Sequence, residues 1–164
     1  MKLAVRRAWT ALAFATVLTT GCSDGPTDPT ARIAGSYTAS TVEVNGQARS
    51  LPAVLYDGPV TDGTNRYEAR YEVTTVSLTL NQQDETYTFS GTYRLVSKDG
   101  RFTTETGTST DRGIYSVEGN RVHFDSDRGL DGPLDFWGTM RNGAITLEAI
   151  DPLFEESNVY VFRR

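Results

Sequence analysis

The sequence predicts an all-β domain, built as a single antiparallel meander barrel of eight to ten strands. From Ile33 onward, apolar and polar residues alternate with a period of two, which is typical of strands with one buried face. No later segment keeps a helical period over ten residues. The alternating segments are separated by dipeptides that favour the positive φ angles of hairpin turns: Asn45-Gly46, Asp99-Gly100, Gly119-Asn120 and Asn142-Gly143.

The first half of the domain gives four segments with this pattern. Strands are expected near 35–44, 66–81, 85–97 and 101–117, with weaker extended structure at 49–56. The fourth strand is expected to bend at Gly107 or Gly113. The alternating apolar residues of the second and third strands are Val76, Leu78 and Leu80, then Tyr87, Phe89, Tyr93 and Leu95.

The second half gives four shorter strands, expected at 121–126, 134–141, 144–150 and 158–163. The last of them is apolar on both faces. Because the connections are short, neighbours in sequence are expected to pair as hairpins, and closing the sheet into a barrel removes its exposed edges. An open β-sandwich is the alternative.

The N-terminal residues 1–21 have the layout of a secretion signal. Basic residues come first, an apolar run at 8–18 follows, and small residues precede Cys22. The apolar run is shorter than the roughly 20 residues that a membrane-spanning helix needs. Cys22 is the only cysteine, and a free thiol would be unusual in an oxidising compartment, whereas a lipidated one carries no such difficulty.

The stretch Leu18-Thr19-Thr20-Gly21-Cys22 resembles the lipobox of bacterial lipoproteins, in which cleavage leaves a lipidated cysteine at the new N-terminus. This resemblance implies attachment to a membrane of the bacterial cell envelope through Cys22, facing the periplasm or the surface. Ser23 at the next position favours the outer membrane, as in lipoproteins of the enteric type. Residues 22–32 are rich in proline, glycine and threonine and are expected to be a disordered tether, with the domain at 33–164.

Composition excludes some partners. Removing residues 1–21 takes away three basic residues and no acidic one, which leaves 13 basic and 21 acidic residues and a net charge of −8. Nucleic acid is not an expected partner, because its binding needs a clustered basic surface. The same balance indicates that membrane attachment depends on the acyl chains rather than on charge.

Both ends of the domain resemble those of the lipocalins. Gly35-Ser36-Tyr37 is similar to the Gly-x-Trp motif of the first lipocalin strand, and the closing segment 160–164 is similar to the last strand, whose arginine covers that aromatic ring. Tyr37 and either Arg163 or Arg164 would then close the barrel, through a cation–π contact. The chain also resembles small bacterial lipoproteins with lipocalin-like domains, on the motifs Val44-Asn45-Gly46, Leu51-Pro52 and Tyr160-Val161-Phe162-Arg163-Arg164.

Catalytic and metal-binding patterns are absent from the sequence. His123 is the only histidine, and its neighbours Val122 and Phe124 place it on the outward face of its strand. A Ser-His-Asp or Cys-His nucleophile and a zinc site are therefore not expected. The acidic segment 125–131 differs from a calcium loop, because Leu130 and Phe136 occupy the positions of the glycine and the bidentate glutamate. We expect no enzyme, no metal and no cofactor.

The aromatic residues leave two functions open. In a small barrel, Tyr87, Phe89, Tyr93 and Phe136 either fill the interior or line a pocket for one small, largely apolar ligand. The first hypothesis is such a ligand-binding lipoprotein. The alternative is a protein-interaction module with a solid barrel, acting as an inhibitor or an envelope assembly factor. Trp137 alternates outward with Asp135 and Thr139 and is the candidate partner surface.

Overall fold

The computed structural model describes residues 29–151 and 156–164. The expected signal peptide and Cys22 lie outside the described residues. No helix in the described part of the chain is long and apolar enough to cross a membrane. The elements are α1 (Pro29–Ile33), β1 (Gly35–Val44), β2 (Gln47–Ser50), β3 (Ala53–Asp62), β4 (Asn65–Asn81), β5 (Thr86–Ser97), β6 (Glu105–Glu118), β7 (Arg121–Ser126), η1 (Gly129–Asp131), β8 (Trp137–Arg141), β9 (Ala144–Ile150) and β10 (Ser157–Arg163).

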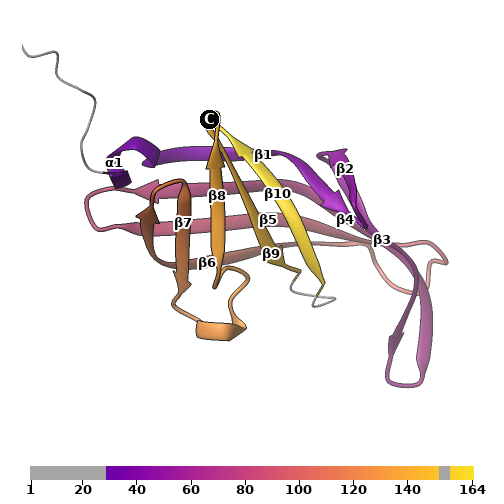
Figure 1. Cartoon of the computed structure of the whole chain (residues 1–164). Coiled ribbons are helices and arrows are strands. Elements are labelled where there is room, and N and C mark those ends of the chain that lie inside the picture. Colours follow the sequence, from indigo (N-terminus) through magenta and orange to yellow (C-terminus); the bar gives the residue numbers. More distant parts are fainter. Residues whose placement is uncertain (1–28, 152–155) are drawn as a thin grey trace, which may run out of the picture.

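Eight strands close an antiparallel barrel (Figure 1). Each strand from β4 to β10 pairs with the next, β10 pairs with β1, and β1 returns to β4. The closing seam is short, because only residues 35–38 of β1 pair with residues 77–80 of β4. The predicted antiparallel barrel is confirmed, and the alternative open sandwich is wrong because its sheets would not meet at such a seam.

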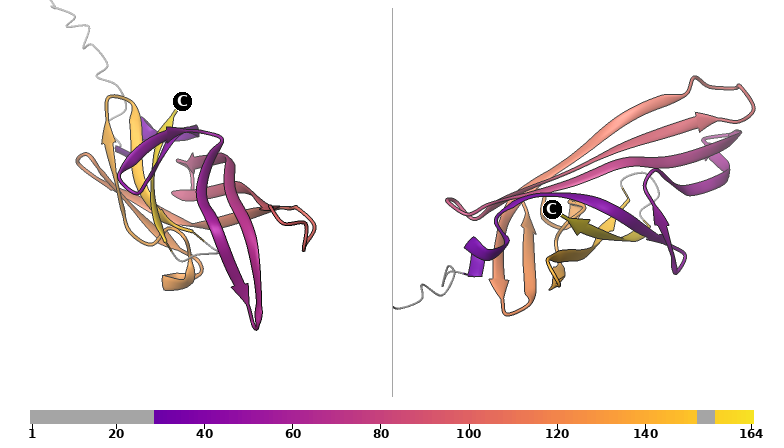
Figure 2. Two further views of the ribbon diagram at one scale, coloured as in Figure 1. Left: turned by 90° about the vertical axis from the view of Figure 1, so that its right-hand side faces the viewer. Right: turned by 90° about the horizontal axis from the view of Figure 1, so that it is seen from above.

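Beyond the seam, β1 and β4 separate. The register shifts between Ala39 and Thr41 in β1 and between Val73 and Thr75 in β4. Past these bulges β1 pairs with β2, and β4 pairs with β3, so both added strands lie outside the barrel. The long strands of this side reach well past the short ones (Figure 2). We call residues 53–73 and 92–110 the extension.

The strand boundaries follow the predicted turns closely in most of the chain. At Asn45-Gly46 the φ angles are 52° and 74°, and at Asn142-Gly143 they are 52° and 73°, so both residues of each pair adopt the left-handed conformation that these hairpins require. The extended segment expected at 49–56 is instead two strands, and β3 continues to Asp62. A helical turn, α1, begins at Pro29, four residues before the expected start of the domain.

The centre of the barrel is filled by its own side chains. The ring of Phe89 lies 6.4 Å from that of Tyr160 and 6.3 Å from that of Phe162, in edge-to-face contacts. The largest side chains that are almost fully buried come from six barrel strands and from the connection before β8: Val42, Tyr71, Val73, Leu78, Tyr87, Phe89, Phe124, Leu134, Ile145, Leu147, Tyr160 and Phe162. Among the described residues the core cluster runs from Ile33 to Phe162, so the domain 29–164 contains this core.

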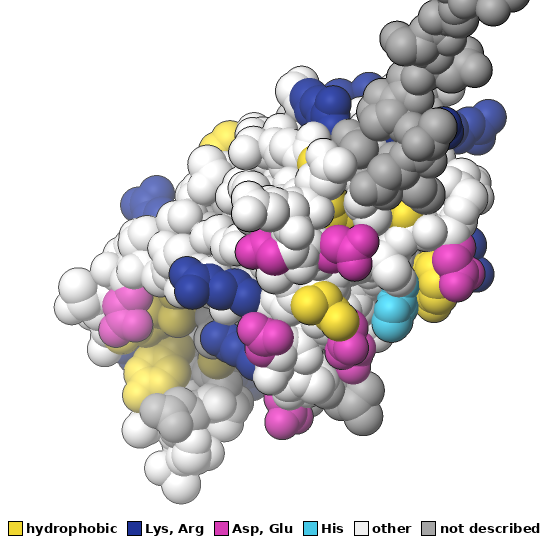
Figure 3. Space-filling model, turned by 90° about the vertical axis from the view of Figure 1, so that its left-hand side faces the viewer, with side chains coloured by type: hydrophobic (Ala, Val, Ile, Leu, Met, Phe, Trp, Pro, Cys, Tyr) yellow, Lys and Arg dark blue, Asp and Glu magenta, His cyan; other side chains and the backbone are white. Residues whose placement is uncertain are grey.

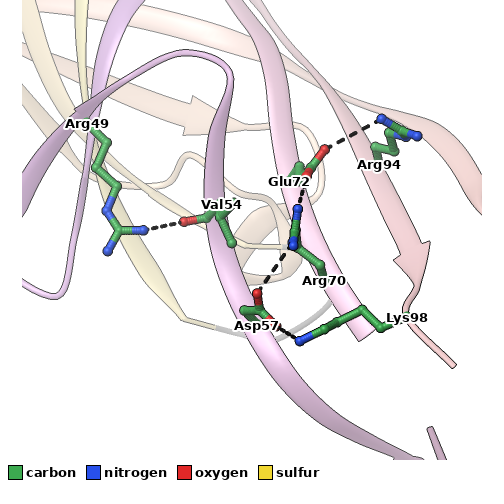
Figure 4. Close-up of polar contacts among 7 residues, drawn as sticks. All are labelled: Arg49, Val54, Asp57, Arg70, Glu72, Arg94 and Lys98. Atoms are coloured by element: carbon green, nitrogen blue, oxygen red, sulfur yellow. Dashed lines mark hydrogen bonds and ion pairs between the residues drawn. The ribbon is translucent and has the colours of Figure 1, made fainter. Parts of the chain in front are cut away.

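Ion pairs bind the strands of the extension together on its outer face (Figure 4). Asp57 of β3 pairs with Lys98 at 2.5 Å and with Arg70 at 3.4 Å. Glu72 of β4 pairs with Arg70 and with Arg94 of β5. The hydrogen bond from Lys98, followed by the charges of Lys98 and Arg70, holds the pKa of Asp57 below its usual value.

Candidate functional site

A pocket of about 400 Å³ lies where the barrel opens onto the extension. We call this end of the barrel the mouth; it carries the connections 98–104 and 127–136. The volume falls in the range of small-molecule sites, roughly 300–1,000 Å³. The pocket is lined by residues of β4, β5 and β6 and by one residue of the β7–β8 connection: Tyr71, Tyr93, Leu95, Glu105, Gly107, Thr108, Ser109, Thr110 and Arg128.

Two tyrosines form the apolar floor of the pocket. The rings of Tyr71 and Tyr93 are stacked, with centroids 5.5 Å apart and planes inclined by 8°. Tyr71 is 1% exposed and Tyr93 is 7% exposed, so the second ring presents the accessible edge. The Tyr93 ring lies back over Gly91, where an added Cβ would come within 2.5 Å of the hydroxyl oxygen. A side chain at position 91 would therefore displace the floor.

The pocket owes its space to a glycine opposite this floor. Gly107 of β6 pairs with Tyr93 of β5, so a side chain there would project into the pocket beside the tyrosine ring. An added Cβ at Gly107 meets no atom within 4 Å. The pocket is therefore open because residue 107 has no side chain. The backbone conformation there is one that any residue can adopt.

Beneath the floor, tyrosine hydroxyls gather around a buried carboxylate. Asp151 is 4% exposed and follows β9. Burial raises the pKa of the Tyr71 and Tyr93 hydroxyls, and the charge of Asp151 raises both further. Burial also raises the pKa of Tyr160, with the interaction with Tyr93 as the next cause. These hydroxyls therefore remain protonated hydrogen-bond donors across the physiological pH range.

A second buried network fixes the position of Arg128. The carboxylate of Asp111, 1% exposed, accepts hydrogen bonds from the Tyr87 hydroxyl and from the Ser126 hydroxyl, both at 2.7 Å. Ser126 Oγ in turn accepts the backbone N–H of Arg128 at 3.1 Å. An added Cβ at Gly132 would lie 2.0 Å from the same oxygen, so the connection packs tightly over the network. Asp111 thereby holds the loop that brings Arg128 to the pocket.

The rim of the pocket is polar. Ser109, on the same face of β6 as Gly107, offers a hydroxyl, and Arg128 and Glu105 offer opposite charges. Within the part of the chain that the structure describes, neither charged group is in an ion pair. An apolar aromatic floor beneath a polar rim suits a small ligand with an apolar body and a polar end.

A smaller hollow continues the apolar surface along the extension. It has a volume of about 240 Å³ and shares Leu95 and Glu105 with the main pocket. Its far wall contains Tyr67 and Phe102, whose rings meet edge to face at 5.8 Å. The apolar surface therefore runs outward from the barrel rather than into its centre.

Of the four residues predicted to line a ligand pocket, only Tyr93 is among the lining residues of this one. Tyr87 and Phe89, 2% and 1% exposed, belong to the packed core, and Tyr87 contacts Phe124 edge to face. Phe136 is half-buried and packs against the core. Sequence reasoning missed Leu95, Gly107 and Arg128 as pocket residues, although Leu95 was placed on the correct face of β5.

The predicted closing contact is made by Arg164. Its guanidinium carbon lies 5.1 Å from the centre of the Tyr37 ring, and Nη2 donates to the carbonyl of Ala34 at 2.8 Å. Arg163 is exposed and occupies a ladder position opposite Thr38. The register of β10 therefore places Arg164, and not Arg163, over the Tyr37 ring.

Trp137 lies on the outer face of the barrel and is covered by its own neighbours. The guanidinium carbon of Arg121 lies 4.2 Å from the ring centre, and the ring of His123 lies 4.8 Å away on the paired strand. In Figure 3 the single histidine reaches the surface beside a hydrophobic side chain. Its orientation agrees with the outward face expected for His123. A protein partner at Trp137 stays a prediction.

Among the described residues, no group of three or more acidic, histidine or cysteine side chains is placed to hold a metal ion.

Comparison of the chain with protein-family models, with curated proteins and with solved structures gives no match. The function is therefore argued from the geometry of the barrel and of its pocket.

Proposed function

We propose that this protein is a lipid-anchored lipoprotein of the bacterial cell envelope that binds a small, largely apolar ligand at the mouth of its barrel. The observation that carries the proposal is the pocket between Tyr93 and Gly107, which stays open while the barrel centre is packed. The anchor at Cys22 is supported by the sequence pattern alone.

The lining suggests how such a ligand would be held. Its apolar part would lie against the edge of the Tyr93 ring and against Leu95, where burial contributes about 25 cal/mol per Å² of apolar area. A polar or anionic end would face Arg128 and the hydroxyl of Ser109. The hollow beside Phe102 gives room for an elongated body.

A pocket-filling variant tests the proposal. Gly107→Leu places an isobutyl group in the open volume, whereas Thr106→Leu places the same group on the outer face of the same strand. The domain 29–164 and both variants would be purified and examined by native mass spectrometry for co-purified small molecules. Rebinding of fatty acids, quinones and isoprenoids would then be measured by calorimetry.

We expect the unmodified domain and T106L to bind the same ligand, and G107L to bind it at least tenfold more weakly while unfolding at a similar temperature. Equal affinity in all three proteins would place the ligand elsewhere. A domain that carries no small molecule and binds none of the panel would support the alternative function, a protein-interaction module. That alternative is favoured by one observation, the packed centre of the barrel.

A further inference from the structure

A second hollow, of about 340 Å³, lies at the opposite end of the barrel from the mouth. We call this end the base; it carries α1, the turns at 119–120 and 142–143, and residues 163–164. Three arginines line the hollow, and no carboxylate side chain is among its described lining residues. Its principal polar residues are Arg32, Asn120, Arg141, Asn142 and Arg164.

The antiparallel ladder brings these arginines together. Arg141 ends β8 and Arg163 ends β10, and both occupy positions opposite Ala144, the first residue of β9. Arg164 follows directly and reaches α1, where Nη2 donates to the backbone carbonyl of Arg32 at 3.2 Å. Three guanidinium groups from distant parts of the sequence thus surround one hollow.

Arg141, the last residue of β8, and Arg164, the residue after β10, are not in the ion pairs of the extension. Those pairs join Asp57, Glu72 and Asp99 to basic residues of the extension itself. Among the described residues, the base together with the β4–β5 turn at 82–85 carries five arginines against three acidic residues, in contrast to the acidic balance of the whole domain: Arg32, Arg121, Arg141, Arg163 and Arg164 against Asp84, Glu85 and Glu118. Basic side chains, dark blue in Figure 3, lie near the part of the surface where the described chain begins.

The mouth lacks this basic excess. Its two connections, 98–104 and 127–136, carry four acidic residues, Asp99, Asp127, Asp131 and Asp135, against three basic ones, Lys98, Arg101 and Arg128. The net negative charge of the domain is therefore not evenly distributed. Such a separation orients a molecule in the field of a charged surface.

We propose that the base docks onto an anionic lipid surface, with lipid phosphates bound by the arginines of this hollow. Guanidinium groups bind phosphate oxygens through paired hydrogen bonds, and basic residues near an anionic bilayer attract it individually. The choice of a lipid surface rests on the proposed anchor. The described chain begins at the base, at Pro29, and the seven steps from Cys22 span at most about 25 Å even when fully extended.

The test uses the domain 29–164, which lacks Cys22 and contains the core formed by the described residues. Its binding to vesicles of phosphatidylcholine would be compared with binding to vesicles that also contain phosphatidylglycerol, at low and at high salt. Arg32→Gln with Arg141→Gln removes two charges from the hollow. Arg66→Gln with Arg112→Gln removes two exposed charges from β4 and β6, outside the base.

We expect binding only to the anionic vesicles, lost at high salt, since exposed charges are screened within a Debye length. R32Q/R141Q is expected to weaken it about 25-fold, on the order of fivefold per charge, while R66Q/R112Q changes it less than twofold. Equal losses in both double variants, or no binding to anionic vesicles, would overturn the proposal. Competition by inorganic phosphate at concentrations too low to screen charge would also overturn it, in favour of a site for a free anion. Because the pocket lies at the other end, none of these outcomes affects the ligand experiment.

Discussion

Arg164 covers the ring of Tyr37, the first buried aromatic residue of β1, and so joins the two ends of the domain. The tyrosine hydroxyl donates to the carbonyl of Ile33 at 2.7 Å, and Arg164 donates to the carbonyl of Ala34. These contacts tie α1, β1 and the residue after β10 into one corner at the base. The guanidinium group of Arg164 makes most of these contacts.

Replacing this arginine is expected to weaken the corner. Arg164→Gln removes the cation–π contact and the two carbonyl hydrogen bonds, and should lower the free energy of unfolding by about 1–2 kcal/mol. Arg163→Gln removes the same charge from an exposed neighbour and should change it by less than about 0.5 kcal/mol. Urea unfolding followed by circular dichroism measures both. Equal losses would show that charge, rather than the Tyr37 contact, stabilises the base.

Tyr87 is expected to stabilise the fold through its hydrogen bond to Asp111, and not to bind a ligand. Tyr87→Phe leaves a buried carboxylate oxygen without its donor at 2.7 Å, which should lower the free energy of unfolding by about 1–3 kcal/mol. Tyr67→Phe, at a half-buried ring of the extension, should have little effect. Thermal unfolding of the two variants is the measurement. A ligand affinity that falls in Y87F at unchanged stability would contradict this role.

Two glycines of β6 are expected to respond oppositely to alanine. At Gly113 an added Cβ would lie 1.9 Å from the carbonyl oxygen of Asp125, so Gly113→Ala must separate β6 from β7 and should be strongly destabilising. At Gly107 the space is open, and Gly107→Ala should stabilise the strand by about 0.5–1 kcal/mol. Chemical unfolding of both variants tests the contrast, and a loss in G107A would show that the backbone there needs glycine.

The buried tyrosines predict an alkaline limit of stability. Burial raises the pKa of Tyr71, Tyr87, Tyr93 and Tyr160 in the folded state, while the unfolded chain ionises near its ordinary value of about 10. Below that value the folded and unfolded states bind the same protons, so stability is complete. Above it, the unfolded state loses protons that the folded state keeps, and stability falls as the pH rises.

Spectrophotometric titration measures this effect. Of the eight tyrosines, these four should not ionise until the domain unfolds, and their ionisation should coincide with the loss of the circular dichroism signal. Tyr71→Phe should remove part of the decline above pH 10. A smooth titration of all eight groups around one pKa, in a folded domain, would contradict the burial of the cluster.

Much of the barrel could be predicted from the sequence because its turns and its alternation are local. β1, β7 and β9 begin and end where the patterns place them. Residues with positive φ form the turn after β1 (Asn45-Gly46) and those before β7 (Gly119) and β9 (Asn142-Gly143). The full length of β3, the edge strand of the extension, could not be predicted in this way. Gly58 and Pro59 are residues typical of a turn, yet both lie within β3. An edge strand accommodates proline because one side of its backbone has no partner.

The pocket illustrates a different limit. Alternation places Tyr87, Phe89 and Tyr93 on one face of β5, but it does not give their height along the barrel axis. That height depends on the closing seam and on the bulges, which involve residues far apart in sequence. Arg128 reaches the pocket only through a network that begins at Asp111, and no local pattern indicates it.

The pairing of β1 with β10 has a consequence for how the molecule is made. The barrel cannot close until the seven-residue strand β10 has been made, because β10 pairs with β1, the first strand of the domain. Long-range pairing of this kind delays folding. A polypeptide threaded through a translocation channel would therefore stay open until its tail has passed, and would assemble only on the far side.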